Sequence, residues 1–261
     1  MRSRSVQVPG RLSVAFALAT AASLLPVAAW TGQALARPVA TVPPDGIITG
    51  PARIIDGDTI DIAGTRIRLE GIDAPEAGQT CQTASGEAWD CGTEATKFMV
   101  SMTRGHDVEC HGQGLDKYGR LLATCYAADL DVNAEMVLRG YAWAFVRYSK
   151  VYVAKEAAAR SAHAGIWQGY AQPAWEYRAA QWTANLNEAK QAAPNGCAIK
   201  GNVSRSGQVY HMPWSPWYAK VSMALDKGKR WFCSEAEALA AGWRPAIMRQ
   251  SDIRATRPVE R

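Results

Sequence analysis

Two short acidic segments contain the residues best suited to chemistry. Asp56 and Asp58 lie in one turn, and Asp73 and Glu76 lie in another, with Arg68 five residues before Asp73. Carboxylates that come together repel each other, and a hard cation would offset this repulsion. Oxygen ligands without His or Cys favour Ca²⁺ or Mg²⁺. The alternative is a set of solvated turn acids, since Asp is common in turns.

A second group of charged residues lies between two predicted strands. Asp116 to Arg120 reads Asp-Lys-Tyr-Gly-Arg, so Lys117, Tyr118 and Arg120 fall within five residues. Arginine and lysine at the end of a hairpin are suited to binding a phosphate group. The alternative is an ordinary exposed turn.

Alternating apolar residues predict the elements that hold these side chains. Strands are expected near residues 53–55, 59–62 and 66–69, followed by a helix near 95–102 and a hairpin that brings Cys110 opposite Cys125. Asp131 is expected to cap a short helix that stops at Gly140, and a third helix is expected near 152–164. The pattern predicts an α+β, β-rich fold: a five-stranded barrel with about three helices, plus a small C-terminal module.

All six cysteines follow the first 36 residues, and an even number in an exported protein indicates disulfides. Hairpin geometry pairs Cys110 with Cys125, and a short polar loop separates Cys81 from Cys91. The remaining two, Cys197 and Cys233, lie in the C-terminal module. A zinc site is the alternative, but no pair has the spacing that zinc ligands usually show.

The N-terminus has the pattern of an export signal. Three arginines and no acid precede an apolar run from Leu12 to Trp30, and the small-residue site Ala34-Leu35-Ala36 follows this run. We expect cleavage after Ala36 and a secreted or periplasmic protein. An uncleaved signal, with transient membrane association, is the alternative, because the run of about 19 residues is close to a spanning length.

Composition and charge exclude some classes of protein and indicate the domain organisation. The chain of 261 residues has 48% hydrophobic and 20% charged residues, which argues against long disorder and a multi-span membrane protein. Its net charge of +5 is too small to identify a nucleic-acid binder. Residues 37–194 hold 15 basic and 19 acidic side chains, whereas residues 195–261 hold 11 and 5, so two modules are expected. The predicted organisation is a signal peptide at 1–36, a linker at 37–46, a barrel domain at 47–178, a linker or connecting helix at 179–194, a basic Cys- and Trp-containing module at 195–248, and a disordered tail at 249–261.

Three motifs together resemble the staphylococcal-type thermonuclease family. They are Ile55-Asp-Gly-Asp-Thr59, Arg68-Leu-Glu-Gly-Ile-Asp-Ala-Pro-Glu76 and Asp116-Lys-Tyr-Gly-Arg120. Their order and spacing make the resemblance specific, although each motif alone would be weak. The resemblance covers about residues 47–178. It implies an OB-fold barrel and a calcium-dependent phosphodiesterase that acts on DNA and RNA and leaves 3′-phosphates.

The resemblance also implies a role for individual residues. Asp58, Asp73 and the carbonyl of Ala74 match metal ligands. Glu76 matches the residue that activates or orients the attacking water. The catalytic arginines are matched by Arg68 and Arg120.

Substrate binding matches less completely. Lys117 and Tyr118 match positions that contact a neighbouring phosphate. Val146 stands near a position where the family has a tyrosine, so Phe145 and Tyr148 are the nearby aromatic candidates, and Tyr148 is the predicted substrate contact. The acidic balance of residues 37–194 differs from a strongly basic nuclease domain, which predicts weak non-specific affinity for DNA.

The C-terminal module resembles a small domain of bacterial exported proteins called a sunset domain, and this resemblance implies no function. Its basic charge and Trp residues are compatible with binding nucleic acid or polysaccharide. We favour a compact core filled by tryptophan, in which His211 is structural rather than a ligand or a catalytic base.

The sequence therefore predicts an exported nuclease, which needs nucleic acid and Ca²⁺ but no stable protein partner and acts as a monomer. The alternative is a non-catalytic envelope-associated protein that binds through its C-terminal module. A nuclease requires Arg68, Glu76 and Arg120, whereas a binding protein would not.

Overall fold

A computed structural model describes residues 45–189, 193, 197–204 and 207–246, which all belong to one compact unit, Val39–Arg261. The predicted signal peptide and its cleavage site, most of the predicted linker at 37–46, and the predicted tail at 249–261 lie outside the described residues. In the described part of the chain, no helix has the length and apolar character needed to cross a membrane.

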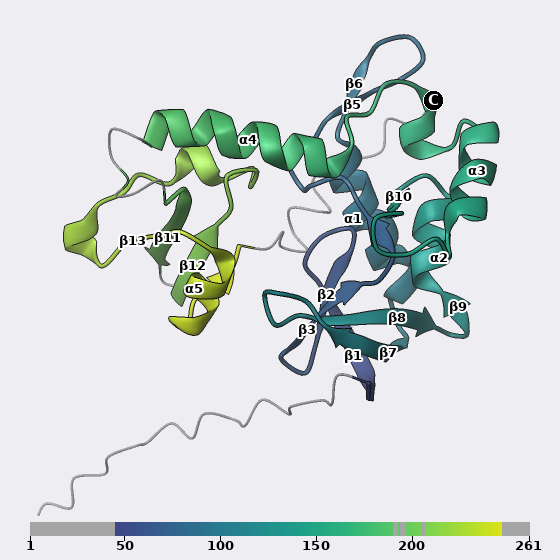
Figure 1. Ribbon diagram of the computed structural model, residues 1–261, viewed down its shortest axis with the longest axis horizontal. Coiled ribbons are helices and arrows are strands. Elements are labelled where there is room, and N and C mark those ends of the chain that lie inside the picture. Colours follow the sequence, from purple (N-terminus) through teal and green to yellow (C-terminus); the bar gives the residue numbers. More distant parts are fainter. Residues whose placement is uncertain (1–44, 190–192, 194–196, 205–206, 247–261) are drawn as a thin grey trace, which may run out of the picture. The chain divides into compact units, whose positions relative to one another are not determined.

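A closed barrel of five strands forms the centre of the N-terminal part (Figure 1). The strands are β1 (Ile47–Ile54), β2 (Thr59–Ile62), β3 (Thr65–Leu69), β7 (Asp107–Leu115) and β8 (Leu121–Ala127). Neighbours in the order β3-β2-β1-β7-β8 are antiparallel, and a parallel pairing of β3 with β8 closes the barrel. Every second residue of β8 is buried, as expected for a strand with one face on the core. The predicted five-stranded OB-fold barrel is confirmed.

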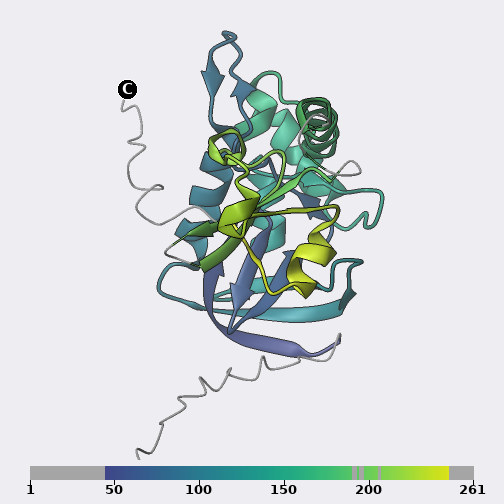
Figure 2. The same cartoon turned by 90° about the vertical axis from the view of Figure 1, so that its left-hand side faces the viewer.

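Short strands extend this barrel and its loops. β9 (Leu130–Asp131) pairs with the edge of β8, and β4 (Ile72–Asp73) pairs with β10 (Trp143–Ala144). A further hairpin, β5 (Cys81–Gln82) with β6 (Ala88–Trp89), projects from the barrel domain (Figure 2). The β4–β10 pair matters for the site because it fixes Asp73 opposite Trp143.

Five α-helices and three short 3-10 helices complete the described elements. They are α1 (Cys91–Thr103), α2 (Val132–Leu138), α3 (Val153–Ser161), α4 (Ala174–Ala189), α5 (Glu235–Ala240), η1 (Gly165–Gln168), η3 (Tyr218–Lys220) and η4 (Leu225–Lys227). The three predicted helices correspond to α1, α2 and α3, and Asp131 caps α2 by accepting a hydrogen bond from the backbone of Ala134.

The segment expected to be a linker or connecting helix at 179–194 is a helix over most of its length. This helix, α4, begins at Ala174, within the predicted barrel domain. Pro173 stands directly before this helix at the N-cap position, and its carbonyl accepts hydrogen bonds from the backbone N–H groups of Glu176 and Tyr177.

Three disulfides join the cysteines in the predicted pairs. Cys110 and Cys125 are direct partners in the β7–β8 register, and both are fully buried in the barrel core. The Cys81–Cys91 bond connects β5 to the first residue of α1, and Cys197 pairs with Cys233 in the C-terminal module.

A four-stranded sheet with the order β13-β11-β12-β14 forms the C-terminal module. The strands are β11 (Ile199–Ser204), β12 (Gly207–His211), β13 (Arg230–Phe232) and β14 (Arg244–Pro245). Its core packs Ile199, Tyr210 and Phe232 with Trp243, whose ring meets that of Phe232 edge-on at 5.2 Å between centroids. The module thus has a compact core, as expected, but Trp243 is the one of its four tryptophans in this core, whereas Trp214 and Trp217 are half-buried.

Candidate active site

Asp58 links the first acidic turn to the second. Its carboxylate is buried and accepts hydrogen bonds from the Thr59 hydroxyl, at 3.1 Å, and from the backbone N–H of Ala74, at 2.7 Å. Its carbonyl accepts from the backbone of Leu69, the last residue of β3. Three segments separated in sequence therefore meet at Asp58.

Arg68 joins the two predicted metal-binding carboxylates. It projects from β3 with 14% of its side chain exposed and forms an ion pair with Asp58. Its Nη2 atom also donates to Asp73 Oδ1 at 2.6 Å. The repulsion between Asp58 and Asp73 is thus offset here by the guanidinium group that, by the family resemblance, is expected to contact the reacting phosphate.

A second arginine, Arg178, which no local sequence pattern indicates, lies in the first turns of α4. Its two terminal nitrogens donate to both oxygens of Asp73, at 3.0 and 2.9 Å, and one of them also reaches Glu76 at 2.8 Å. Burial by itself lowers the pKa of Arg178, but the charges of Asp73 and Glu76 raise it above its ordinary value. We call Asp58, Arg68, Asp73, Glu76 and Arg178 the acid–arginine cluster.

The ion-pair partner of Glu76 in this cluster is Arg178, which Glu76 shares with Asp73. Burial raises its pKa from 4.5 to about 7, although the charge of Arg178 lowers it, and the nearby Asp56 raises it further. The buried side chain of Gln79 accepts a hydrogen bond from the Glu76 backbone N–H and donates to the carbonyl of Gln172, just before α4. A carboxyl group with a pKa near neutrality is suited to proton transfer.

Two glycines permit the close packing of these segments. A Cβ atom at Gly57, between the two acids of the first turn, would lie 2.8 Å from the side chain of Ala74. A Cβ atom at Gly92, in the first turn of α1, would collide with the carbonyl oxygen of Glu76. Both positions require glycine because another chain segment occupies the space of a side chain.

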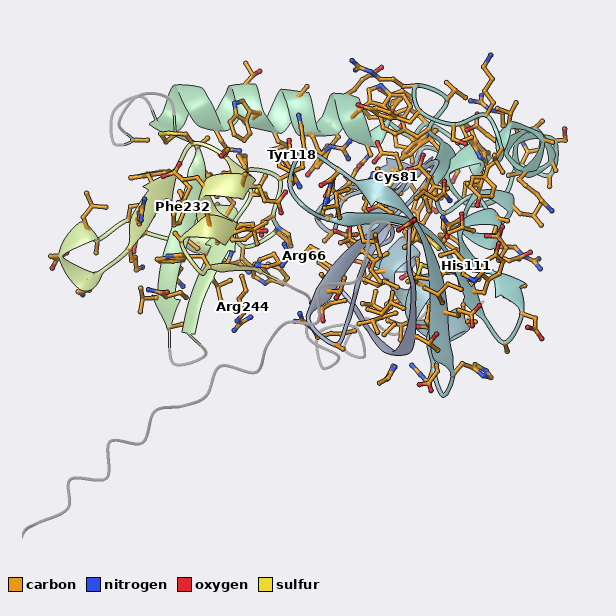
Figure 3. All side chains as sticks on the ribbon, turned by 60° about the horizontal axis from the view of Figure 1, so that its bottom comes forward. Arg66, Cys81, His111, Tyr118, Phe232 and Arg244 are labelled. Atoms are coloured by element: carbon orange, nitrogen blue, oxygen red, sulfur yellow. A yellow bond between two sulfur atoms is a disulfide. The ribbon has the colours of Figure 1, made fainter. Side chains whose placement is uncertain are left out.

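Arg120 reaches the site from the β7–β8 hairpin. Its Nε atom donates to Asp116 at 2.7 Å; burial alone lowers its pKa, but the charges of Glu235 and Asp116 raise it overall. The ring of Tyr118, labelled in Figure 3, lies beneath the charged groups of Arg120 and of the exposed Lys117. The hairpin therefore presents two cations around one aromatic ring.

The predicted contact Tyr148 lies in the loop after β10 and is 70% exposed. Its ring meets Phe145 at 5.1 Å, while Phe145 also stacks on Trp175 of α4 at 5.7 Å. Tyr148 is accessible, whereas Phe145 is partly covered by its neighbours.

One pocket includes Glu76 and Arg120 in its lining, together with Asp56. Trp214 and Trp217 of the C-terminal module line the same pocket. Arg66 of β3, Tyr210 and Glu235 line it as well. Arg66 donates to the Tyr210 hydroxyl, which in turn donates to Glu235 at 2.5 Å (Arg66 is labelled in Figure 3).

The donor atoms of the predicted metal site suit a hard cation, because they are two carboxylates and a backbone carbonyl with no nitrogen or sulfur. Within the described ranges, no three His, Cys, Asp or Glu side chains are grouped so that they could hold a metal ion. The two carboxylates are instead satisfied by Arg68 and Arg178.

Comparisons with known proteins match two regions of the chain. A family model described as staphylococcal nuclease homologue matches residues 66–169, and a second model, ArfC, matches residues 179–245. The micrococcal nuclease of Shigella flexneri is 34% identical over 146 residues, which cover 49% of this chain and 78% of that protein. An uncharacterized endonuclease of Escherichia coli O157:H7 is 35% identical over 134 residues, covering 48% of this chain and 81% of that protein.

The succinoglycan biosynthesis protein ExoI of Rhizobium meliloti is 39% identical over 129 residues, and the match spans 48% of this chain and 66% of that protein. The OB-fold barrel and these matches define a hydrolase of the nuclease class. The chain belongs to the staphylococcal nuclease family. The sunset-domain resemblance of the C-terminal module stays a prediction.

Proposed function

We propose that the protein is an exported, calcium-dependent nuclease that hydrolyses phosphodiester bonds in DNA and RNA and leaves 3′-phosphates. The observation that carries this proposal is the convergence of Asp58, Arg68, Asp73 and Glu76 from separate segments of the chain. The pocket lined by Glu76 and Arg120 supports it further.

The residues have distinct roles in this proposal. Asp58, Asp73 and the carbonyl of Ala74 would hold Ca²⁺, which when bound supplies positive charge close to the scissile phosphate. Glu76 accepts a proton from the attacking water, and its pKa of about 7 keeps a proton-accepting form available at neutral pH. Arg68 and Arg120 donate hydrogen bonds to the phosphate oxygens, where a planar guanidinium can bind two atoms at once.

Substrate binding and export complete the proposal. Lys117, Tyr118 and Tyr148 contact the nucleic acid on either side of the reacting phosphate. The protein is a secreted or periplasmic monomer whose signal peptide is cleaved after Ala36. Three disulfides support export, because such bonds persist in oxidising compartments.

The test uses purified protein that starts at Arg37, with plasmid DNA and RNA as substrates. We expect cleavage with Ca²⁺, loss of cleavage with a calcium chelator, and recovery when Ca²⁺ is restored. Replacing Glu76 by Gln lowers kcat by at least ~10²-fold while circular dichroism shows an unchanged fold. Wild-type protein that cuts neither DNA nor RNA would favour the envelope-binding alternative.

A further inference from the structure

Arg178 occupies a position that the family resemblance does not explain. Asp73 has no exposed side-chain surface, and each of its oxygens accepts a hydrogen bond from Arg178, while Oδ1 also accepts from Arg68. Paired hydrogen bonds between a guanidinium and a carboxylate are strong and have a fixed geometry. The carboxylate that is proposed to bind a cation is therefore already neutralised by the chain.

The chain holds this arginine in place through the start of α4. The Tyr177 hydroxyl donates to the carbonyl of Gly78 at 3.2 Å, and Trp175 stacks on Phe145. Gln79 also donates to the carbonyl of Gln172. The backbone around Arg178 is thus attached to the loop that carries Glu76. Movement of the Arg178 side chain alone would free Glu76 and leave Asp73 with Arg68 as its one arginine partner among the described residues.

Charge balance makes Arg178 and a divalent cation competitors. Arg178 donates to both oxygens of Asp73, so a cation that binds either oxygen would lie next to the guanidinium, and two positive groups next to each other repel. We propose that Arg178 is the internal counter-ion of Asp73 and Glu76, and that a divalent cation binds Asp73 only when it displaces the Arg178 side chain. This inference rests on the proposed calcium site.

Displacement has two consequences. The cation affinity is lowered in proportion to the small fraction of molecules in which Asp73 is released. Glu76 also loses its Arg178 partner at the moment when the cation binds, so its carboxylate becomes free to accept a hydrogen bond from water. Arg178 would therefore couple cation binding to the release of the proposed base.

Calcium binding, measured directly by isothermal titration calorimetry without nucleic acid, tests the competition. We expect the Kd for Ca²⁺ of Arg178→Gln to be at least ~10-fold lower than that of the wild type, because the competing charge is gone. The matched control is Arg139→Gln, which removes an exposed arginine paired with Glu135 on α2 and should leave the Kd unchanged.

A second measurement uses the unmodified protein. Calcium added to isotope-labelled wild type should shift the side-chain Nε–H resonance of Arg178, while that of Arg139 stays in place. If Arg178→Gln does not fold, Arg178→Lys replaces it, because lysine keeps the charge but cannot form the two-pronged contact; its Kd should lie below that of the wild type.

The outcomes separate this inference from the proposed function. An equal or weaker affinity in the Arg178 variant, or an Arg178 resonance that Ca²⁺ does not shift, overturns the competition even if the wild type cleaves nucleic acid. If neither protein binds Ca²⁺, the competition and the calcium dependence are both wrong. Tighter binding in the Arg178 variant with no nuclease activity in either protein supports the competition and rejects the function.

Discussion

The barrel and the C-terminal module bury polar groups in opposite ways. In the acid–arginine cluster, the buried carboxylates of Asp58 and Asp73 have charged partners. In the module, His211 is also buried, yet within the described part of the chain neither ring nitrogen has a hydrogen-bond partner. Burial lowers the pKa of His211 to about 4, and the charges of Lys200 and Lys229 lower it too. The barrel pairs its buried carboxylates with arginines, whereas the C-terminal module avoids a buried charge by keeping its histidine neutral.

This difference between the two regions indicates that chemistry is to be expected in the barrel rather than in the C-terminal module. Concentrated charge in a protein interior is costly, so its presence at one site suggests a functional use. A neutral histidine beside Trp217 fits a structural role in an aromatic module.

Replacing Arg68 by Ala should have the largest effect in the barrel. Asp58 loses its ion-pair partner and Asp73 loses one of two, so the free energy of unfolding should fall by about 3–5 kcal/mol. The rate constant kcat should fall at least ~10²-fold. Denaturant unfolding and nuclease assays measure the two quantities.

Arg53→Ala is the control for this prediction, because Arg53 forms an exposed pair with Asp61. That pair should contribute less than about 1 kcal/mol. Equal losses of stability in the two variants would contradict the contrast between a paired interior and an ordinary surface.

Acid should destabilise the protein through His211. Its pKa is about 4 in the folded state and near 6.5 when unfolded, so the unfolded state binds more protons between these values. Stability is therefore lost as the pH falls from about 6.5 to about 4, by up to about 3 kcal/mol. Comparing unfolding at both pH values in wild type and His211→Phe isolates this contribution.

His111→Gln serves as the matched control, since His111 is exposed on β7 and pairs with Glu109. It should keep the acid sensitivity of the wild type. A His211→Phe protein that loses as much stability in acid as the wild type would show that the histidine is not held neutral.

Tyr210→Phe should have a smaller effect. The hydroxyl of Tyr210 accepts from Arg66 and donates to Glu235, so its removal leaves both without that partner. We expect a loss of about 1–2 kcal/mol in the free energy of unfolding, measured by denaturant titration. A loss confined to chain segments outside 197–246, detected by hydrogen exchange, would contradict this assignment.

Local patterns in the sequence predicted most of the barrel, but they did not reveal one of the two arginines that pair with the acids of the site. The register that places Cys110 opposite Cys125 follows from two strands around one loop, so it was predictable. The family resemblance implied that Asp58 and Asp73 share one cation, whereas spacing alone left solvated turn acids as the alternative. The sequence did not reveal Arg178, whose partner Asp73 lies 105 residues earlier, because no local spacing signals so distant an ion pair.

The helix α4 contains Arg178, Trp182 and Asn185 on one face, because residues four and three apart align on a helix. Arg178 contacts the acids, Trp182 packs against the core of the module, and Asn185 donates to the carbonyl of Pro213 at 3.0 Å. One residue inserted between Arg178 and Trp182 would rotate the second contact by about 100° relative to the first. The helix therefore fixes the rotation of the module contact relative to the acid contact. It tolerates substitutions on its outer face but not a change in length.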